Sequence, residues 1–105
     1  MSPRPLGYAT LAVLKALADG RRYGFDVIDQ TGLPSGTVYP ALATLTRKKL
    51  LTAHWEDRDV AQAEGRPRRR YYEVTREGAT ALVEAMRRFD ALGLGAPRGA
   101  EGKAR

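Results

Sequence analysis

The pattern of apolar residues predicts three helices in the first half of the chain. Apolar side chains recur at helical spacing over residues 6–18, 24–31 and 35–49, with polar residues between them. A glycine follows each of the first two stretches, as expected where a helix stops. Ser35 is suited to cap the third helix, and Pro40 near its start favours an irregular or late first turn.

An alternating pattern follows the three helices and predicts a β-hairpin. Apolar and polar residues alternate over residues 51–57, which places Leu51 and Trp55 on one face of a half-buried strand. We expect Trp55 to lie in the core or at the base of the hairpin. A second strand is predicted over residues 69–74. The polar stretch between the strands, residues 58–65, is longer than a tight turn, so we expect a mobile loop there.

A last apolar stripe predicts a helix over residues 76–92, with Thr75 as its cap. Part of this stripe can cover the domain's own core. A stripe of this length on a terminal helix would still leave an exposed apolar patch in a monomer. We therefore expect two copies of the chain to pair through this helix, with the contacts made by Leu82, Val83, Met86 and Phe89.

The order of these elements predicts a mainly α protein with a two-stranded β wing. Three helices, two strands and a further helix are typical of a winged helix-turn-helix unit, which we place at residues 1–75. A C-terminal dimerisation helix follows at residues 76–92. Residues 93–105 are rich in glycine, alanine and charge without periodicity, and they predict a disordered tail.

Charge narrows the choice of partner. The 105 residues carry a net charge of +6 and a pI of about 10.1. Such a balance favours polyanionic partners, with nucleic acid ahead of an anionic membrane. No stretch approaches the roughly 20 apolar residues of a membrane span, and the first residues lack the apolar core of a signal peptide. We expect a cytoplasmic protein with no membrane partner.

The candidate chemistry does not favour an enzyme. The chain has no cysteine, which excludes disulfides, thiolate nucleophiles and cysteine-ligated metals. Its one histidine, His54, has no evident partner to orient it as a general base. Neither a glycine-rich phosphate loop nor a metal-ligand spacing is present in the sequence. We expect no catalytic residue, no metal and no cofactor.

The start of the third predicted helix is a candidate DNA-reading element. In a helix-turn-helix motif the second helix enters the major groove, and its first residues meet base edges and phosphates. Free N–H groups at a helix N-terminus also favour a phosphate. An ordinary capped helix would show the same residue types, so this stretch alone leaves both readings open. The candidates are Ser35, Gly36, Thr37, Tyr39 and Pro40.

Two cations at the end of the same helix, Arg47 and Lys48, are further candidates. The helix dipole favours positive charge at a C-terminus whatever the function of the helix. These side chains could also reach a phosphate beside the groove.

Four arginines at the start of the second strand give a sharper signal. Such density brings mutual repulsion that a polyanion would relieve, and arginine pairs bidentately with phosphate and enters narrow minor grooves. The alternative is a basic loop held by nearby acidic residues, namely Glu56, Asp57, Asp59 and Glu64. Together with the helix start, the cluster favours DNA. The four arginines are Arg66, Arg68, Arg69 and Arg70.

Taken together, these motifs resemble the PadR family of bacterial transcriptional regulators. The resemblance covers residues 6–89 and depends on several short strings in the right order and spacing. They are Tyr23-Gly24, residues 35–42, Leu50-Leu51, Trp55-Glu56, residues 65–72, and Thr75 with Gly78.

The resemblance implies a homodimeric winged-helix repressor that binds a palindromic promoter site and releases it when a small-molecule effector binds. It also implies that residues 35–40 open the recognition helix and residues 65–70 form the wing. The chain resembles the short branch of the family, which has a single C-terminal helix. Some short members hold flat drugs between tryptophans of that helix, whereas here Phe89 is its only aromatic residue.

The predicted function is therefore a sequence-specific transcriptional regulator whose partners are double-stranded DNA, a second copy of itself and a small-molecule effector. Three alternatives stay open: a winged helix from another regulator group, a winged-helix protein–protein module, and a basic RNA-binding domain. The salt dependence of binding separates them, because a protein that contacts many phosphates loses affinity steeply as salt rises.

Overall fold

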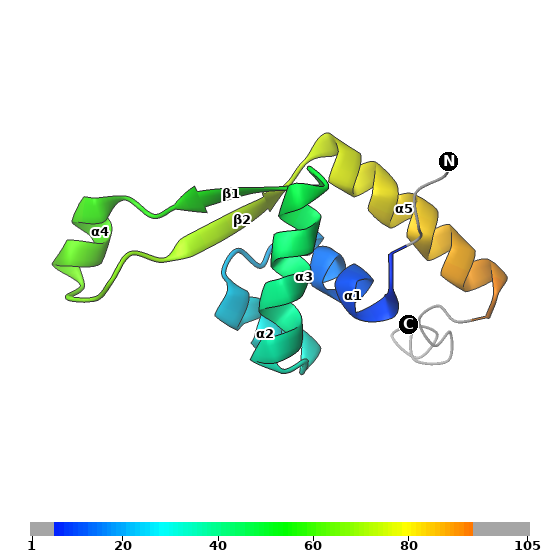
Figure 1. Ribbon diagram of the computed structural model, residues 1–105, viewed down its shortest axis with the longest axis horizontal. Helices are drawn as coiled ribbons and strands as arrows, with labels where there is room; N and C mark the ends of the chain where they lie inside the picture. Colours follow the sequence, from blue (N-terminus) through cyan, green and yellow to red (C-terminus); the bar gives the residue numbers. More distant parts are fainter. Residues whose placement is uncertain (1–5, 94–105) are drawn as a thin grey trace, which may run out of the picture.

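The computed structural model describes residues 6–93 and confirms a mainly helical winged-helix fold with one antiparallel hairpin (Figure 1). The tail prediction falls outside the described residues except at Gly93, which forms a turn. The elements in chain order are α1 (Tyr8–Ala18), α2 (Gly24–Thr31), α3 (Ser35–Arg47), β1 (Leu51–Trp55), α4 (Arg58–Ala63), β2 (Arg70–Val74) and α5 (Arg76–Ala91).

The core lies where α1, α2 and α3 meet the base of the sheet. The apolar stripe predicted for α3 is confirmed, because Val38, Leu42 and Leu45 are all buried. Each fully buried aliphatic side chain of this kind stabilises the fold by roughly 1.5–3 kcal/mol. The largest fully buried side chains are Leu14, Leu42, Leu45, Leu51, Val13, Val27 and Val38.

The start of α3 differs from the prediction. The helix begins at Ser35 with Pro34 in the capping position, so Ser35 is its first residue and makes no capping hydrogen bond. The predicted late or irregular start was wrong, because Pro40 lies inside the helix. Its missing N–H leaves the carbonyl of Gly36 without the usual partner four residues on. Both residues are exposed, so water can satisfy that carbonyl.

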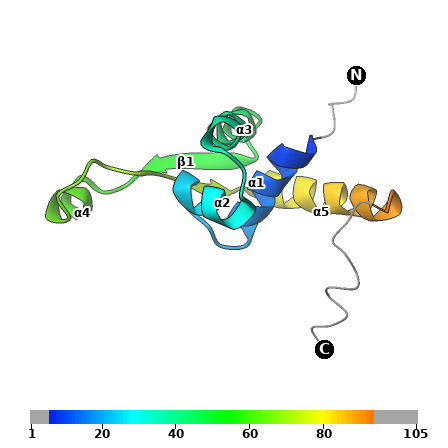
Figure 2. The same ribbon diagram turned by 90° about the horizontal axis from the view of Figure 1, so that it is seen from below.

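The hairpin pairs Leu51 with Val74 at its base and Trp55 with Arg70 at its far end. The strand β1 was predicted correctly, and Leu51 at its start is buried against the helices. Trp55 was expected in the core or at the base of the hairpin, and this was wrong. The strand extends past the helical body (Figures 1 and 2). Trp55 lies at its far end, with 55% of its surface exposed. An alternating pattern shows which face of a strand a residue lies on, but not whether the helices extend far enough to cover that residue.

Two short features of the hairpin were not predicted. The chain before α2 forms a single bridge to β2, and the N–H of Tyr72 donates to the carbonyl of Arg22 at 2.9 Å. The expected mobile loop is the helix α4 at the tip of the hairpin (Figure 1). The carboxylate of Asp57 caps this helix by accepting from the N–H of Asp59 at 2.7 Å.

The helix α5 begins as predicted, with the Thr75 hydroxyl accepting from the N–H of Gly78 at 2.9 Å. It packs on α1 and on β2 and then runs away from the body on the side opposite the wing (Figures 1 and 2). No helix within residues 6–93 is long and apolar enough to span a membrane.

Candidate nucleic-acid interface

The exposed start of α3 is positioned by one close contact with α2. The ring of Tyr39 lies against Gly24, where an added Cβ would come within 2.5 Å of a ring carbon. A glycine at position 24 therefore lets Tyr39 lie across the start of α2 with 48% of its surface exposed. Ser35, Gly36 and Pro40 are exposed beside it, and Thr37 is half-buried. The five predicted residues thus come together at one helix end.

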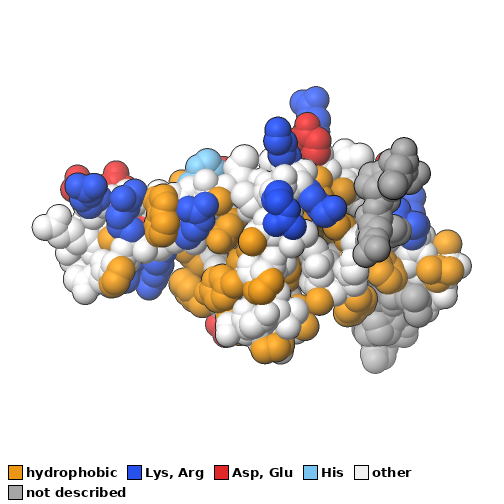
Figure 3. Space-filling view, in the orientation of Figure 1, with side chains coloured by type: hydrophobic (Ala, Val, Ile, Leu, Met, Phe, Trp, Pro, Cys, Tyr) orange, Lys and Arg blue, Asp and Glu red, His pale blue; other side chains and the backbone are white. Residues whose placement is uncertain are grey.

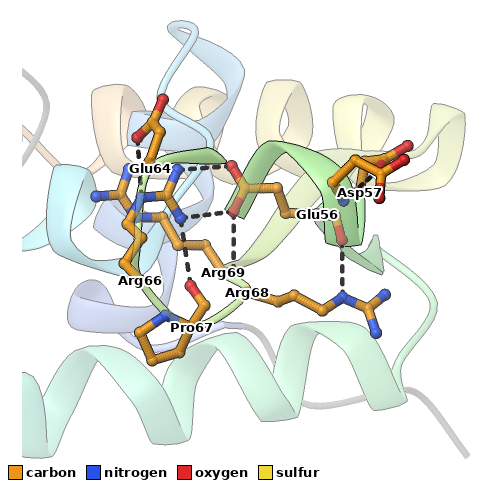
Figure 4. Close-up of polar contacts among 8 residues, drawn as sticks. Glu56, Asp57, Glu64, Arg66, Pro67, Arg68 and Arg69 are labelled. Carbon is orange, nitrogen blue, oxygen red and sulfur yellow. Dashed lines mark hydrogen bonds and ion pairs between the residues drawn. The ribbon is translucent and has the colours of Figure 1, made fainter. Parts of the chain in front are cut away.

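The wing is held by a buried ion pair that involves one of the four arginines. The carboxylate of Glu56 receives two hydrogen bonds from Arg66, at 2.6 and 2.9 Å, and a third from the N–H of Arg69 at 3.2 Å (Figure 4). Glu64 accepts a further bond from Nε of Arg66 at 3.0 Å. Only 8% of the Glu56 surface is exposed. We call Glu56, Arg66 and the N–H of Arg69 the wing clasp.

The wing clasp changes the titration of its members. Hydrogen bonds from Arg66, helped by the N–H of Arg69 and by both positive charges, lower the pKa of Glu56 from 4.5 to about 2, although burial opposes them. The same hydrogen bonds with Glu56 and then with Glu64 raise the pKa of Arg66 further above its ordinary value. Both groups are charged throughout the physiological range, so the wing clasp is an ion pair.

Arg66 therefore has a visible structural role that differs from the predicted phosphate contact. Carboxylates occupy its guanidinium, and 19% of its side chain is exposed. The sequence left open a basic loop held by acidic residues instead of DNA. For Arg66 this alternative holds, because it pairs with Glu56 and Glu64. A contact between Arg66 and DNA stays a prediction.

The other three arginines rest on aromatic rings. Within residues 6–93, none of them lies in an ion pair with a carboxylate. Arg69 lies 4.9 Å from the ring centre of Phe25, on the start of α2. Arg68 and Arg70 lie over the ring of Trp55, at 5.8 and 5.1 Å. Rings of this kind attract a cation without neutralising its charge.

The wing and α3 meet in a small open recess. Tyr39 of α3 and the side chains of Phe25, Arg69 and Arg70 line it together. On the face drawn in Figure 3, Lys and Arg side chains follow the wing and also gather at the C-terminal end of α3. Arg47 and Lys48 are exposed at that end. The predicted DNA residues other than Arg66 thus present positive charge and polar groups on neighbouring surfaces.

Sequence reasoning missed two aromatic residues of this surface. Phe25 is an apolar residue of the second predicted helix, yet 42% of its surface is exposed, and it stacks on Tyr23 at 5.3 Å. Trp55 was expected in the core or at the base of the hairpin. The four arginines lie far from both aromatic residues in the sequence, so no local pattern indicated these contacts.

The four residues predicted for dimerisation lie away from this surface, on α5. Leu82 packs partly against the domain's own core, and Phe89 makes an edge contact with Tyr8 of α1 at 5.9 Å. Met86 is half-buried, while half of the Val83 surface is exposed. Pairing through these residues stays a prediction.

No three acidic, histidine or cysteine residues within residues 6–93 cluster closely enough to hold a metal ion. His54 lies on the wing, 3.2 Å from the carboxylate of Glu73.

Comparison with known proteins agrees with this geometry. Residues 13–84 match the family described as "Transcriptional regulator PadR-like family". No curated protein matches the sequence. The fold is similar to that of a PadR family transcription regulator from Clostridium difficile R20291, at 24% identity and a TM-score of 0.72, covering 83% of this chain and 92% of that one.

Two further solved structures are similar at slightly higher identity. A PadR-like transcription factor from Bacteroides fragilis shares 26% identity at a TM-score of 0.68, with 80% of this chain and 82% of that chain covered. The Bordetella bronchiseptica protein BpsR, whose DNA binding is regulated by 6-hydroxynicotinic acid, shares 26% identity at a TM-score of 0.65. That alignment covers 88% of this chain and 64% of BpsR.

Proposed function

Because this chain belongs to the PadR-like family of transcriptional regulators, we propose that it is a repressor that binds a palindromic operator as a homodimer and responds to a small-molecule effector. It acts by binding and carries out no reaction. The finer parts of this proposal are argued below from the described residues.

The observation that supports DNA binding most directly is the recess shared by Tyr39 and the wing arginines. It makes the start of α3 and the wing arginines Arg69 and Arg70 parts of one surface. In such a surface the arginines would supply affinity through phosphates, which carries no sequence information. The exposed residues at the start of α3 would supply the sequence preference through base edges.

The homodimer is supported by apolar surface on α1 and α5. Tyr8 and Leu92 are each 71% exposed, and Val83 is 50% exposed. Large exposed side chains at one end of the molecule, away from the wing, fit a two-fold contact between copies. Such a dimer would present two recognition helices to the two half-sites of a palindrome.

The response to an effector is proposed by analogy with BpsR, the similar protein whose DNA binding 6-hydroxynicotinic acid regulates. The effector would have to bind one dimer geometry more tightly than the other, since a ligand shifts an equilibrium only through such a difference. Repression would follow from occupying a promoter until the effector changes the angle between the recognition helices.

The test is footprinting of the purified protein on the DNA upstream of its own gene, followed by titration of the protected duplex against salt. We expect protection of two half-sites related by a two-fold axis, and a log–log salt slope of about −0.9 for each phosphate contacted. A tighter complex with RNA of the same sequence would contradict the proposal. A shallow salt slope with no preference for duplex would instead indicate a protein–protein module.

A further inference from the structure

Trp55 is a large aromatic residue that is more than half exposed, so packing in the core does not explain its presence. Its partner across the hairpin is Arg70, and it lies on the same sheet face as the buried residues Leu51 and Tyr72. Because the hairpin extends beyond the helices, this face continues past the core, and Trp55 stands on it more than half exposed. A large aromatic ring in that position, beside the recess that contains Tyr39, points to a role in binding.

Two guanidinium groups share this one ring. Arg70 lies 5.1 Å and Arg68 5.8 Å from its centre. Nε of Arg68 also donates to the carbonyl of Glu56 at 2.9 Å, so the wing clasp and the indole hold this side chain together. Arg68 lies two residues before Arg70, the first residue of β2, and both guanidinium groups reach the same ring. The wing thus carries two cations, a short distance apart, on a shared aromatic support.

Two cations held this close repel each other in the free protein, and a free arginine side chain loses much rotational freedom on binding. The ring offsets part of both costs, because it attracts each cation and restricts its motion before any partner arrives. The charges stay available because the ring does not neutralise them.

We propose that Trp55 is a positioning residue of the DNA interface: it holds Arg68 and Arg70 where both can contact neighbouring phosphates of one DNA strand. This inference rests on the proposed DNA-binding function. It differs from a purely structural role, because Trp55 would act through the two arginines and not through the stability of the fold.

The first test compares Trp55→Leu with Trp55→Phe on a mixed-sequence 30-base-pair duplex carrying a fluorophore, with affinity measured by anisotropy. Trp55→Leu should weaken binding about tenfold, the effect of losing two exposed cation–ring contacts. Trp55→Phe, which keeps an aromatic face, should recover most of the loss. The salt slope of Trp55→Leu should equal that of the wild type, whereas Arg68→Ala should reduce it by about 0.9.

A double-mutant cycle separates positioning from an independent effect. If Trp55 acts through the two arginines, Trp55→Leu should cost little more once Arg68→Ala and Arg70→Ala are both present. Additive losses would overturn the proposal, as would Trp55→Leu binding as tightly as the wild type. Should Trp55→Leu fold poorly by circular dichroism, the cycle is repeated with Trp55→Gln, which also lacks an aromatic face, against the same arginine variants, and additive losses there would overturn the proposal equally.

The fluorescence of Trp55, the single tryptophan of the chain, gives an independent readout. Its emission should change on binding unlabelled duplex, because DNA would cover the exposed ring. A duplex that binds by anisotropy with no change in Trp55 emission would overturn this inference and leave the proposed function intact. A wild-type protein that binds no duplex at low salt would overturn both.

Discussion

At the scale of single residues, Thr75 fixes the junction between the recognition helix and α5. Its hydroxyl accepts from the N–H of Gly78 at 2.9 Å and donates to the carbonyl of Lys49 at 2.8 Å. Its own N–H donates to the carbonyl of Leu50 at 3.1 Å. One side chain thus caps α5 and ties it to the end of α3. The direction in which α5 leaves the body follows from this junction.

Gly78 is required there by the close approach of α5 to the preceding chain. A Cβ at this position would lie 2.1 Å from the carbonyl oxygen of Leu50. We expect Gly78→Ala to destabilise the protein by about 1–3 kcal/mol, because this overlap outweighs the better helix propensity of alanine. Urea unfolding would measure it. Gly36→Ala, a helical position with open space around it, is the control and should be neutral or stabilising. Equal stability of the two variants would contradict this account.

Lys49 adopts a left-handed backbone conformation, with φ of 66°, directly after α3. The N–H of Leu50 donates to the carbonyl of Leu45 at 3.0 Å, which is the helix ending usually made with glycine. We expect Lys49→Gly to stabilise the protein by about 0.5–1 kcal/mol in thermal unfolding, because glycine has no Cβ to strain. Lys48→Gly, at φ of −80°, should not stabilise it. A larger gain at position 48 than at position 49 would refute the argument.

At the scale of elements, the wing clasp gives the wing a fixed shape. A hairpin that extends beyond the body has few apolar contacts to order it, and α4 at its tip has a single buried side chain, Ala61. The ion pair between Glu56 and Arg66 joins the end of β1 to the chain that enters β2. The remaining arginines are therefore presented from an ordered support.

The wing clasp predicts a pH dependence in acid. Because the pKa of Glu56 is lowered to about 2 in the folded protein, its contribution is complete above its ordinary pKa of 4.5 and is lost as the pH falls toward 2. The difference in melting temperature between wild type and Glu56→Gln should be largest above pH 4.5 and shrink below it. Glu84→Gln, at an exposed position of α5, is the control. A difference that stays constant across this range would contradict the lowered pKa.

Most elements were predictable because their signals are local. The signals for α1, α3, α5 and β1 depend on neighbours in sequence, and the structure confirms that these elements form. The helix α4 was missed because six residues are too few to show a periodic stripe. The pairing of Glu56 with Arg66 joins residues ten apart, across a loop whose path the sequence did not reveal. The sequence predicted where the candidate site lies in the chain and that it is positively charged. It did not predict which of the four arginines forms an ion pair with a carboxylate.

At the scale of the whole molecule, the two proposed contacts lie at opposite ends. The wing extends from one side of the helical body, and α5 runs out on the other (Figures 1 and 2). A contact between copies at α5 would therefore leave both wings uncovered. Leu82 is a poor probe of that contact, because it packs on the domain's own core and a charge there would disturb folding.

Val83 is the sharper probe of the proposed dimer. Its side chain is half exposed on α5, so a charge there should leave the monomer folded and be costly only when a second copy covers it. We expect Val83→Glu to weaken self-association at least about tenfold in sedimentation equilibrium. Ala43→Glu, an exposed position on α3, should associate as the wild type does. A Val83→Glu protein that still sediments as a dimer would place the interface elsewhere.

The contact of Tyr39 with Gly24 has a consequence for how operator preference could change. Any side chain at position 24 would displace the ring of Tyr39 at the start of α3. The position of Tyr39 on the proposed DNA-binding surface thus depends on the absence of a side chain at Gly24 of the preceding helix. A variant with altered promoter choice could arise from that hidden position as readily as from the residues that meet the bases.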